Sequence, residues 1–304
     1  MTDLSTTTLA AALPALESLV ELKRLRPSLW YEPHKRGQRQ FHESRHLIRV
    51  LFPGNRWGKT TAMAVEANWW LNHSHPFQET PTEKIEAVWF CPQRDQFDQL
   101  RDQIETECFD RGWVWRDQDM TYEWPNGSKL KVWSAYTDGL WQRIQGINPH
   151  LVLCDEEPPL MVWRELRRRG AGRRTTRYVI AATATKGSSW MEEELWKPWS
   201  DANTAAGATI GDGGTAVEVQ AHPKIWCWDF GGIDDNPGTT AAQREDAKEQ
   251  STRNDAERRV RLRGGFARFT GNPVFAYDGL ERLEQRAKAM DAKGKGTCGW
   301  VKSA

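Results

Sequence analysis

The chain has 304 residues and a formal net charge of +1, so overall charge alone does not make it a nucleic-acid binder. No apolar run approaches the roughly 18 residues of a membrane span, and no secretory signal opens the sequence. The five scattered cysteines lack metal-ligand spacing and are typical of reduced thiols in a cytosolic protein. His42 and His46 are expected to be ordinary surface histidines.

Hydrophobic periodicity predicts helices and strands that alternate along the chain. Pro27 ends the first helix, and Pro125-Asn126-Gly127 between two short β runs is a strong hairpin signal. In chain order, the first half is expected to contain a helix (9–25), a strand (47–52), a helix (62–71), a strand (85–91), a helix (94–109) and hairpin strands (122–124 and 129–133).

The second half continues this alternation, with a loop expected over 200–216 and a weaker pattern from Gly264 onward. Its expected elements are a strand (150–154), a helix (160–169), a strand (178–182), a helix (190–199), strands (217–219 and 225–228) and helices (239–250 and 254–263). Such alternation predicts an α/β fold with a mostly parallel central sheet flanked by helices in three layers. Ligands of such sheets bind at the carboxyl ends of the strands.

Residues 48–61 join an apolar strand to a helix through a short loop that contains Gly58-Lys59-Thr60. This context is typical of a phosphate-binding loop, whose backbone N–H groups surround phosphates at a helix N-terminus. Lys59 would reach the β- and γ-phosphates, and Thr60 would bind Mg²⁺. The loop departs from the usual pattern because Pro53 stands where glycine is expected and Gly54 follows one residue later. The alternative is an ordinary strand–turn–helix.

A second apolar run, 150–154, ends in Asp155 and Glu156. A buried strand that delivers carboxylates at its C-terminal end is the other half of an ATPase site. Asp155 would hold the Mg²⁺, and Glu156 would polarise the attacking water. The alternative is a solvated acidic turn, but the two elements in this order predict an ATPase that uses ATP and Mg²⁺.

Together these residues resemble the N-terminal ATPase domain of the large terminase subunit of tailed bacteriophages, a motor that threads viral DNA into a capsid. The resemblance covers roughly residues 28–280 and implies a P-loop NTPase with a helicase- or RecA-like core. It places a variant Walker A, with an internal arginine, at Gly54, Asn55, Arg56, Trp57, Gly58, Lys59, Thr60 and Thr61. Tyr31 and Gln38 resemble the segment that reads adenine, with Gln38 on the base edge.

Three further stretches carry the resemblance. Arg143-Ile-Gln-Gly146 is similar to a loop that recurs in these motors. Thr183-Ala184-Thr185 resembles the coupling motif that senses the γ-phosphate, although Lys186 stands where the family has proline. Residues 235–237, 261–266 and 271–275 resemble the stretch that closes the ATPase domain.

The resemblance implies a motor that drives double-stranded DNA into the procapsid in the host cytoplasm, away from membranes. It implies a portal protein and a small terminase subunit as partners, and a homo-oligomeric ring on the portal that is a monomer in isolation. The expected organisation is a helical segment (1–27), an ATPase domain (28–275, with a closing region at 220–275) and a tail (276–304). A nuclease domain is expected to be absent.

Arginines offer two kinds of site. Arg56 could stabilise transition-state charge from its own phosphate loop, and Arg143 could do so across a subunit boundary. The alternative for each is a surface ion pair. A run of arginines could contact DNA phosphates or form a solvated face; it comprises Arg164, Arg167, Arg168, Arg169, Arg173, Arg174 and Arg177.

Other functions remain open. Asp229 at the end of the strand 225–228 could be a nuclease metal ligand, but the residues that follow predict helices rather than further acidic strands. A helicase-like translocase unconnected with packaging would need a second ATPase lobe. A non-catalytic nucleotide- or DNA-binding module would not need Lys59, Thr60, Asp155 and Glu156 together.

Overall fold

The computed structural model describes residues 6–34, 37–137, 139–171, 176–184, 190–208, 220–249 and 255–265. The chain divides into two compact units, Met1–Ala267 and Arg268–Ala304, and every described residue belongs to the first. Among the described residues, no helix has the length and apolar character needed to cross a membrane.

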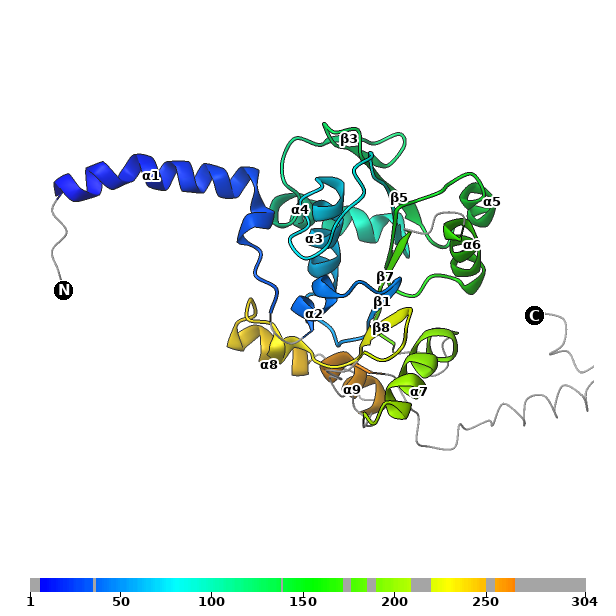
Figure 1. Cartoon of the computed structure of the whole chain (residues 1–304). Helices are drawn as coiled ribbons and strands as arrows, with labels where there is room; N and C mark the ends of the chain where they lie inside the picture. Colours follow the sequence, from blue (N-terminus) through cyan, green and yellow to red (C-terminus); the bar gives the residue numbers. More distant parts are fainter. Residues whose placement is uncertain are drawn as a thin grey trace, which may run out of the picture. The chain divides into compact units, whose positions relative to one another are not determined.

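An eight-stranded sheet forms the frame of this unit, with strand order β3-β4-β5-β2-β6-β7-β1-β8 (Figure 1). The six strands β5-β2-β6-β7-β1-β8, in the order in which they lie in the sheet, are parallel to their neighbours. Only the pairs β3–β4 and β4–β5 are antiparallel. The predicted mostly parallel sheet is therefore confirmed. The strands are β1 (Ile48–Leu51), β2 (Glu86–Cys91), β3 (Val114–Arg116), β4 (Thr121–Glu123), β5 (Lys129–Ser134), β6 (Leu151–Asp155), β7 (Arg177–Ala181) and β8 (Ile225–Trp228).

Nine helices occur in the described part of the chain, besides short 3₁₀ turns and a π-helical turn at Glu192–Trp196. They are α1 (Thr6–Leu25), α2 (Gln38–Glu43), α3 (Lys59–Leu71), α4 (Arg94–Glu107), α5 (Leu140–Ile144), α6 (Leu160–Gly170), α7 (Lys197–Ala205), α8 (Ala241–Glu249) and α9 (Asp255–Arg263).

The sheet separates two hydrophobic cores. One face packs against α3 and α4, and the other packs against α5, α6 and α7 (Figure 1). Alternate residues of the central strands enter opposite cores, as when Trp89 lies in the core with α3 and α4 and Phe90 lies in the core with α5, α6 and α7. Because both faces of the central strands are covered, β1, β6 and β8 are mostly apolar along their whole length, with Arg49 of β1 buried in an ion pair and Asp155 at the end of β6. This is why the sequence identifies them.

The structure adds three short elements that the sequence did not predict. Strand β3 packs one aromatic ring, Trp115, and its place is set by hydrogen bonds to β4. Helices α2 and α5 have six and five residues, too few to display a helical period. The helix predicted over 190–199 continues to Ala205, in the expected loop, because Asn203 is buried and bonds the carbonyl of Trp199. The strand predicted at 217–219 lies outside the described residues.

Candidate nucleotide site

The centre of the sheet brings three strand ends to one edge. Strand β7 lies between β6 and β1, and its Ala181 pairs with both Asp155 and Leu51. Because the three strands are parallel, the residues that follow them emerge together. The phosphate loop, the two acids and Thr183 therefore meet at the carboxyl edge, where ligands of such sheets bind.

The phosphate loop runs from Pro53 to Gly58 and leads directly into α3. Gly58 has φ +97°, and a side chain there would lie 2.7 Å from the Gln38 amide nitrogen, so only glycine fits. The ammonium of Lys59 donates to the carbonyls of Pro53 and Gly54 at 2.8 and 2.9 Å. Burial lowers the pKa of Lys59 to about 8, although the nearby charges of Glu156 and Asp155 oppose that shift.

Thr60 and Asp155 bring two oxygen ligands together. The Thr60 hydroxyl donates to Asp155 Oδ1 over 3.3 Å. Burial raises the pKa of Asp155 to about 7, and the adjacent Glu156 adds to this rise. A hydroxyl beside a carboxylate suits Mg²⁺, which prefers oxygen ligands and keeps several waters. A bound cation would also favour the charged carboxylate that burial disfavours.

Glu156 connects the acidic strand end to its neighbours. Its backbone N–H donates to the Ala181 carbonyl at 2.7 Å, and its Oε2 accepts the Thr183 backbone N–H at 3.0 Å. The Thr183 hydroxyl donates to Asn55 Oδ1 at 3.2 Å. One chain of contacts therefore joins the acid, the predicted coupling motif and the phosphate loop. Ala184 is buried beside them, and Thr185 lies outside the described residues.

The late segment of the unit packs behind the phosphate loop. The N–H groups of Gly54 and Asn55 donate to the carbonyls of Gly231 and Arg261, and Asn236 donates its amide to the Arg56 carbonyl. A side chain on Gly54 would lie 2.4 Å from the Arg261 carbonyl. Residues 235–237 and 261–265 of the stretch that resembles the domain-closing segment therefore lie against the loop, whereas Phe266 and residues 271–275 lie outside the described residues.

Residues 50–282 match the family described as terminase large subunit, T4likevirus-type, N-terminal. The chain belongs to this family. No curated protein matches the chain.

Solved terminase structures share the fold of this family member. The large terminase of a thermophilic bacteriophage, in complex with ADP, has a TM-score of 0.52 and 12% identity, over 74% of this chain and 52% of that one. A second crystal form of the same phage protein gives a TM-score of 0.50 at 12% identity, over 81% and 52%. This chain therefore spans about half the length of that terminase. At this identity the likeness concerns the fold.

Gln38, the residue predicted to read the adenine base, has its amide engaged within this terminase chain. Its Oε1 accepts from the His34 backbone N–H and the Tyr31 hydroxyl at 3.1 and 3.2 Å. Its Nε2 lies 3.3 Å from the Gly58 carbonyl and 3.5 Å from that of Trp57. The buried amide therefore holds the phosphate loop from behind. Trp57 is fully buried against His34, and Thr61 lies half-buried in the first turn of α3.

The expectation that His42 is a surface histidine is wrong. Its side chain is fully buried, with Nδ1 2.7 Å from Glu66 and Nε2 3.1 Å from the Tyr31 hydroxyl. Glu66 also contacts His75 at 3.1 Å and the buried guanidinium of Arg49 at 2.6 Å. The two histidines and Glu66 could surround a cation, but Arg49 already supplies the positive charge. The sequence did contain one indication of this cluster: Glu66 is the only acidic residue in a helix that is otherwise largely apolar, and such a residue needs a buried partner.

The predicted catalytic arginines lie in different places. Arg56 has φ +59° in the phosphate loop, and its guanidinium reaches the Gln243 carbonyl at 3.5 Å. Arg143 is exposed on α5, where it lines a groove with Trp133 of β5. Within the described part of the chain, Arg143 makes no ion pair.

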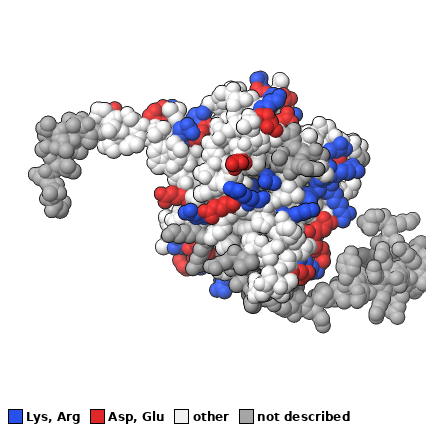
Figure 2. Space-filling model, viewed as in Figure 1, with Lys and Arg blue, Asp and Glu red and all other residues white. Residues whose placement is uncertain are grey.

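Three arginines of the run form ion pairs with two neighbouring carboxylates. Figure 2 shows blue side chains gathered over α6 with red ones beside them. Arg164 pairs with Glu194, while Arg168 and Arg169 share Glu165. Arg167 lies over the Trp163 and Tyr178 rings. These contacts favour the structural role, and Arg173 and Arg174 lie outside the described residues.

Asp229, the alternative nuclease ligand, is buried at the end of β8. Its Oδ2 accepts the Trp196 indole N–H at 2.9 Å, and its Oδ1 has no hydrogen-bond partner. Burial raises its pKa to about 6. Among the described residues, no group of metal-ligating side chains includes Asp229.

Proposed function

We propose that this chain is the ATP-hydrolysing motor domain of a terminase large subunit and that it powers translocation of double-stranded DNA into a procapsid. The observation that carries the proposal is the meeting of Lys59, Thr60, Asp155 and Glu156 at one sheet edge. Thr183 joins the acids to the phosphate loop there. A charged loop and a carboxylate pair on one edge suit transfer of a phosphoryl group to water.

Each residue has a defined part in this proposal. Thr60 and Asp155 would hold a magnesium ion, which would neutralise charge on the phosphates. The Lys59 ammonium attracts the β- and γ-phosphates, and the Arg56 guanidinium offers a second positive charge. Glu156 accepts a proton from the attacking water. The Thr183 N–H orients the Glu156 carboxylate, so a shift of Thr183 alters both the base and Asn55.

The remaining parts of the proposal concern recognition and assembly. Tyr31 and Gln38 are the proposed adenine-reading residues, and Gln38 lies within hydrogen-bond distance of both Tyr31 and the phosphate-loop carbonyls of Trp57 and Gly58. Portal protein and small terminase subunit are the proposed partners, with a ring of copies on the portal and the host cytoplasm as the location. Membership of the terminase family supports the assignments of partners, assembly and location.

An ATPase assay with purified chain tests the proposal. Wild type should hydrolyse ATP with magnesium, and Lys59→Ala should lose detectable turnover and nucleotide binding.

Glu156→Gln should keep ATP binding but lose turnover by about a hundredfold or more, because the metal ligand remains and the base does not. Asp155→Asn should weaken magnesium-dependent binding instead. Wild-type turnover by Lys59→Ala would refute the site, and normal turnover by Glu156→Gln would move the base to another residue, with Glu157 tested next.

A further inference from the structure

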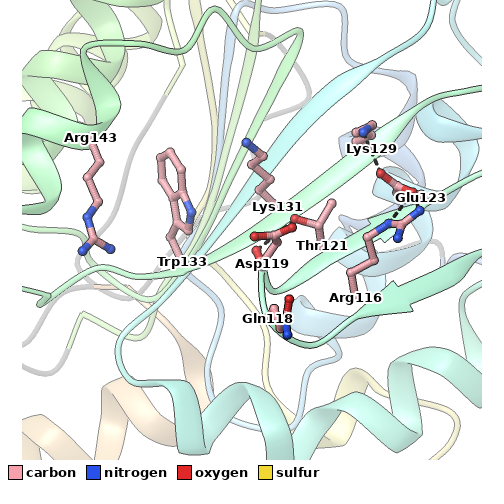
Figure 3. Close-up of a pocket in the computed structure, with 9 residues that line it drawn as sticks. All are labelled: Arg116, Gln118, Asp119, Thr121, Glu123, Lys129, Lys131, Trp133 and Arg143. Carbon is pink, nitrogen blue, oxygen red and sulfur yellow. Dashed lines mark hydrogen bonds and ion pairs between the residues drawn. The ribbon is translucent and has the colours of Figure 1, made fainter.

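The sheet leaves part of one face uncovered by helices. Leu130 and Val132 of β5 and Tyr122 of β4 point into the core beneath α3 and α4. The alternate residues therefore face the side on which α5 and α6 lie, but these helices cover β2 and β6 rather than the antiparallel end. This end forms the floor of a groove of about 420 Å³ (Figure 3).

The groove carries more positive than negative side chains. The residues that line it are Arg116, Gln118, Asp119, Thr121, Glu123, Lys129, Lys131, Trp133 and Arg143. One carboxylate, Glu123, accepts from both Arg116 and Lys129 at 2.6 Å. In the described part of the chain, Lys131 and Arg143 make no ion pair. Two cations therefore make no ion pair among the described residues and two more share Glu123, while Asp119 adds a second negative charge, so four cations and two acids leave an excess of two positive charges.

The arrangement of these cations suits a chain of phosphates. Lys129 and Lys131 are two residues apart on one strand face, which separates them by about 6.6 Å along the strand. A DNA strand carries one phosphate for about every 3.4 Å of helix axis, so two lysines at this spacing can meet phosphates of one strand. Arg143 extends the line from α5, and Trp133 lies half-buried beside it (Figure 3).

We propose that this groove binds the phosphate backbone of duplex DNA, with Lys131 and Arg143 as the primary contacts and Arg116 and Lys129 as secondary ones. The inference rests on the proposed function, since it supplies a DNA contact for the motor. The groove is separate from the nucleotide site, because β5 lies two strands away from β6 and its acids. Ion pairing restrains Arg116 and Lys129, so Glu123 limits how strongly the groove attracts an anion.

Fluorescence anisotropy with a short labelled DNA duplex tests the groove at several salt concentrations. Lys131→Gln should weaken binding and reduce the slope of log affinity against log salt by about 1, the contribution of one phosphate contact. Because the salt concentration rises fourfold between roughly 50 and 200 mM, the affinity deficit of this variant relative to wild type should shrink about fourfold over that range. Lys131→Arg should behave as wild type.

Glu123→Gln should strengthen duplex binding, whereas Lys131→Gln should weaken it. Loss of this carboxylate frees Arg116 and Lys129, so the affinity for the duplex and the salt slope should both increase. A misfolded variant would not gain affinity. Lys197→Gln is the matched control, because Lys197 is an ion-paired lysine on α7, which packs against β8 at the opposite edge of the sheet. It should leave both quantities unchanged.

ATP turnover measured beside duplex binding distinguishes a failure of the groove proposal from a failure of the proposed ATPase function. Basal ATP turnover without DNA should be unchanged in Lys131→Gln and Glu123→Gln. If wild type hydrolyses ATP and binds the duplex while both variants bind with wild-type affinity and slope, the groove is not the DNA contact. If wild type lacks ATPase activity but the two variants shift duplex binding as expected, the proposed function fails and the groove stands.

Discussion

Glu156 has φ +73°, a left-handed conformation that residues other than glycine rarely adopt. Such strain costs of the order of 1–3 kcal/mol and persists only where surrounding contacts impose it. Here the Ala181 carbonyl and the Thr183 N–H hold the residue on both sides. The strained turn directs the carboxylate toward Thr183 rather than along the strand. This geometry supports Glu156, rather than Glu157, as the proposed base.

Asp229 gives a prediction at the scale of a single residue. Its folded pKa of about 6 lies above the ordinary 3.8, so the folded state retains the proton that the unfolded state releases first. Wild-type stability should therefore fall as pH rises from about 4 to about 6 and change little from this source above that. Asp229→Asn keeps an acceptor for Trp196 and removes the charge. Its stability relative to wild type should rise over this interval by up to about 3 kcal/mol.

Urea unfolding at several pH values measures this difference. Asp201→Asn, on the exposed surface of α7, is the control and should not reproduce it. A pH-independent difference for Asp229→Asn would show that the buried carboxylate stays ionised. Magnesium-dependent plasmid cleavage that disappears in Asp229→Asn would instead restore the nuclease interpretation.

At the scale of elements, a buried ionic cluster fastens α2 and β1 to α3. Burial alone would raise the pKa of Glu66, but Arg49, His75 and His42 together hold it well below its ordinary value. Burial lowers the pKa of His42 despite its contact with Glu66. Gln38 lies on α2 and Lys59 begins α3, so the cluster fixes the two sides of the nucleotide site relative to each other.

Removal of one member of this cluster should be costly. Glu66→Leu leaves the Arg49 charge buried without a counter-charge and should destabilise the protein by about 3–5 kcal/mol. The double variant Arg49→Met, Glu66→Leu removes both charges and should recover most of that loss, because apolar replacements of buried ion pairs are often tolerated. Urea unfolding monitored by tryptophan fluorescence gives both values. A double variant no more stable than Glu66→Leu would mean that the histidines, not Arg49, dominate the cluster.

At the scale of the whole molecule, assembly should distinguish the two predicted arginines. Arg56 belongs to the phosphate loop, so Arg56→Ala should lower turnover at every protein concentration. Arg143 lies on α5, and its finger role requires a neighbouring copy. Arg143→Ala should therefore have little effect in dilute protein and a strong effect once copies associate. ATP turnover measured across a concentration series, with oligomeric state from light scattering, checks both expectations.

Mixing variants tests the same point independently. Arg143→Ala combined with Glu156→Gln should restore some turnover, because each copy supplies at a shared interface what the other lacks. If the mixture stays inactive where wild type is assembled and active, Arg143 does not act across subunits. Its place in the groove beside Trp133 would then be its main role.

The sequence by itself determined the strands and helices whose burial is continuous or strongly periodic. Largely apolar runs such as 48–52, interrupted only by Arg49, and 151–154 are typical of strands buried on both faces, so they predicted a parallel sheet and its carboxyl edge. The sequence also predicted that Lys59, Thr60, Asp155 and Glu156 lie at this one edge, because each of them comes at or just after the carboxyl end of a parallel strand. Short elements such as α2 and β3 contain too few residues to show a hydrophobic periodicity, so the local sequence did not predict them.

Tertiary structure decided which polar residues are buried and which partner each one meets. His42 appears as an ordinary polar residue until α3 and β1 bring Glu66 and Arg49 against it. The Thr183–Asn55 contact depends on the order of three strands, and the ion pairs of Arg164, Arg168 and Arg169 depend on Glu165 and Glu194. The alternation of Lys129, Lys131 and Trp133 with apolar residues could have indicated one exposed cationic face. That α5 leaves this face open is a property of packing between distant segments, which no local pattern records.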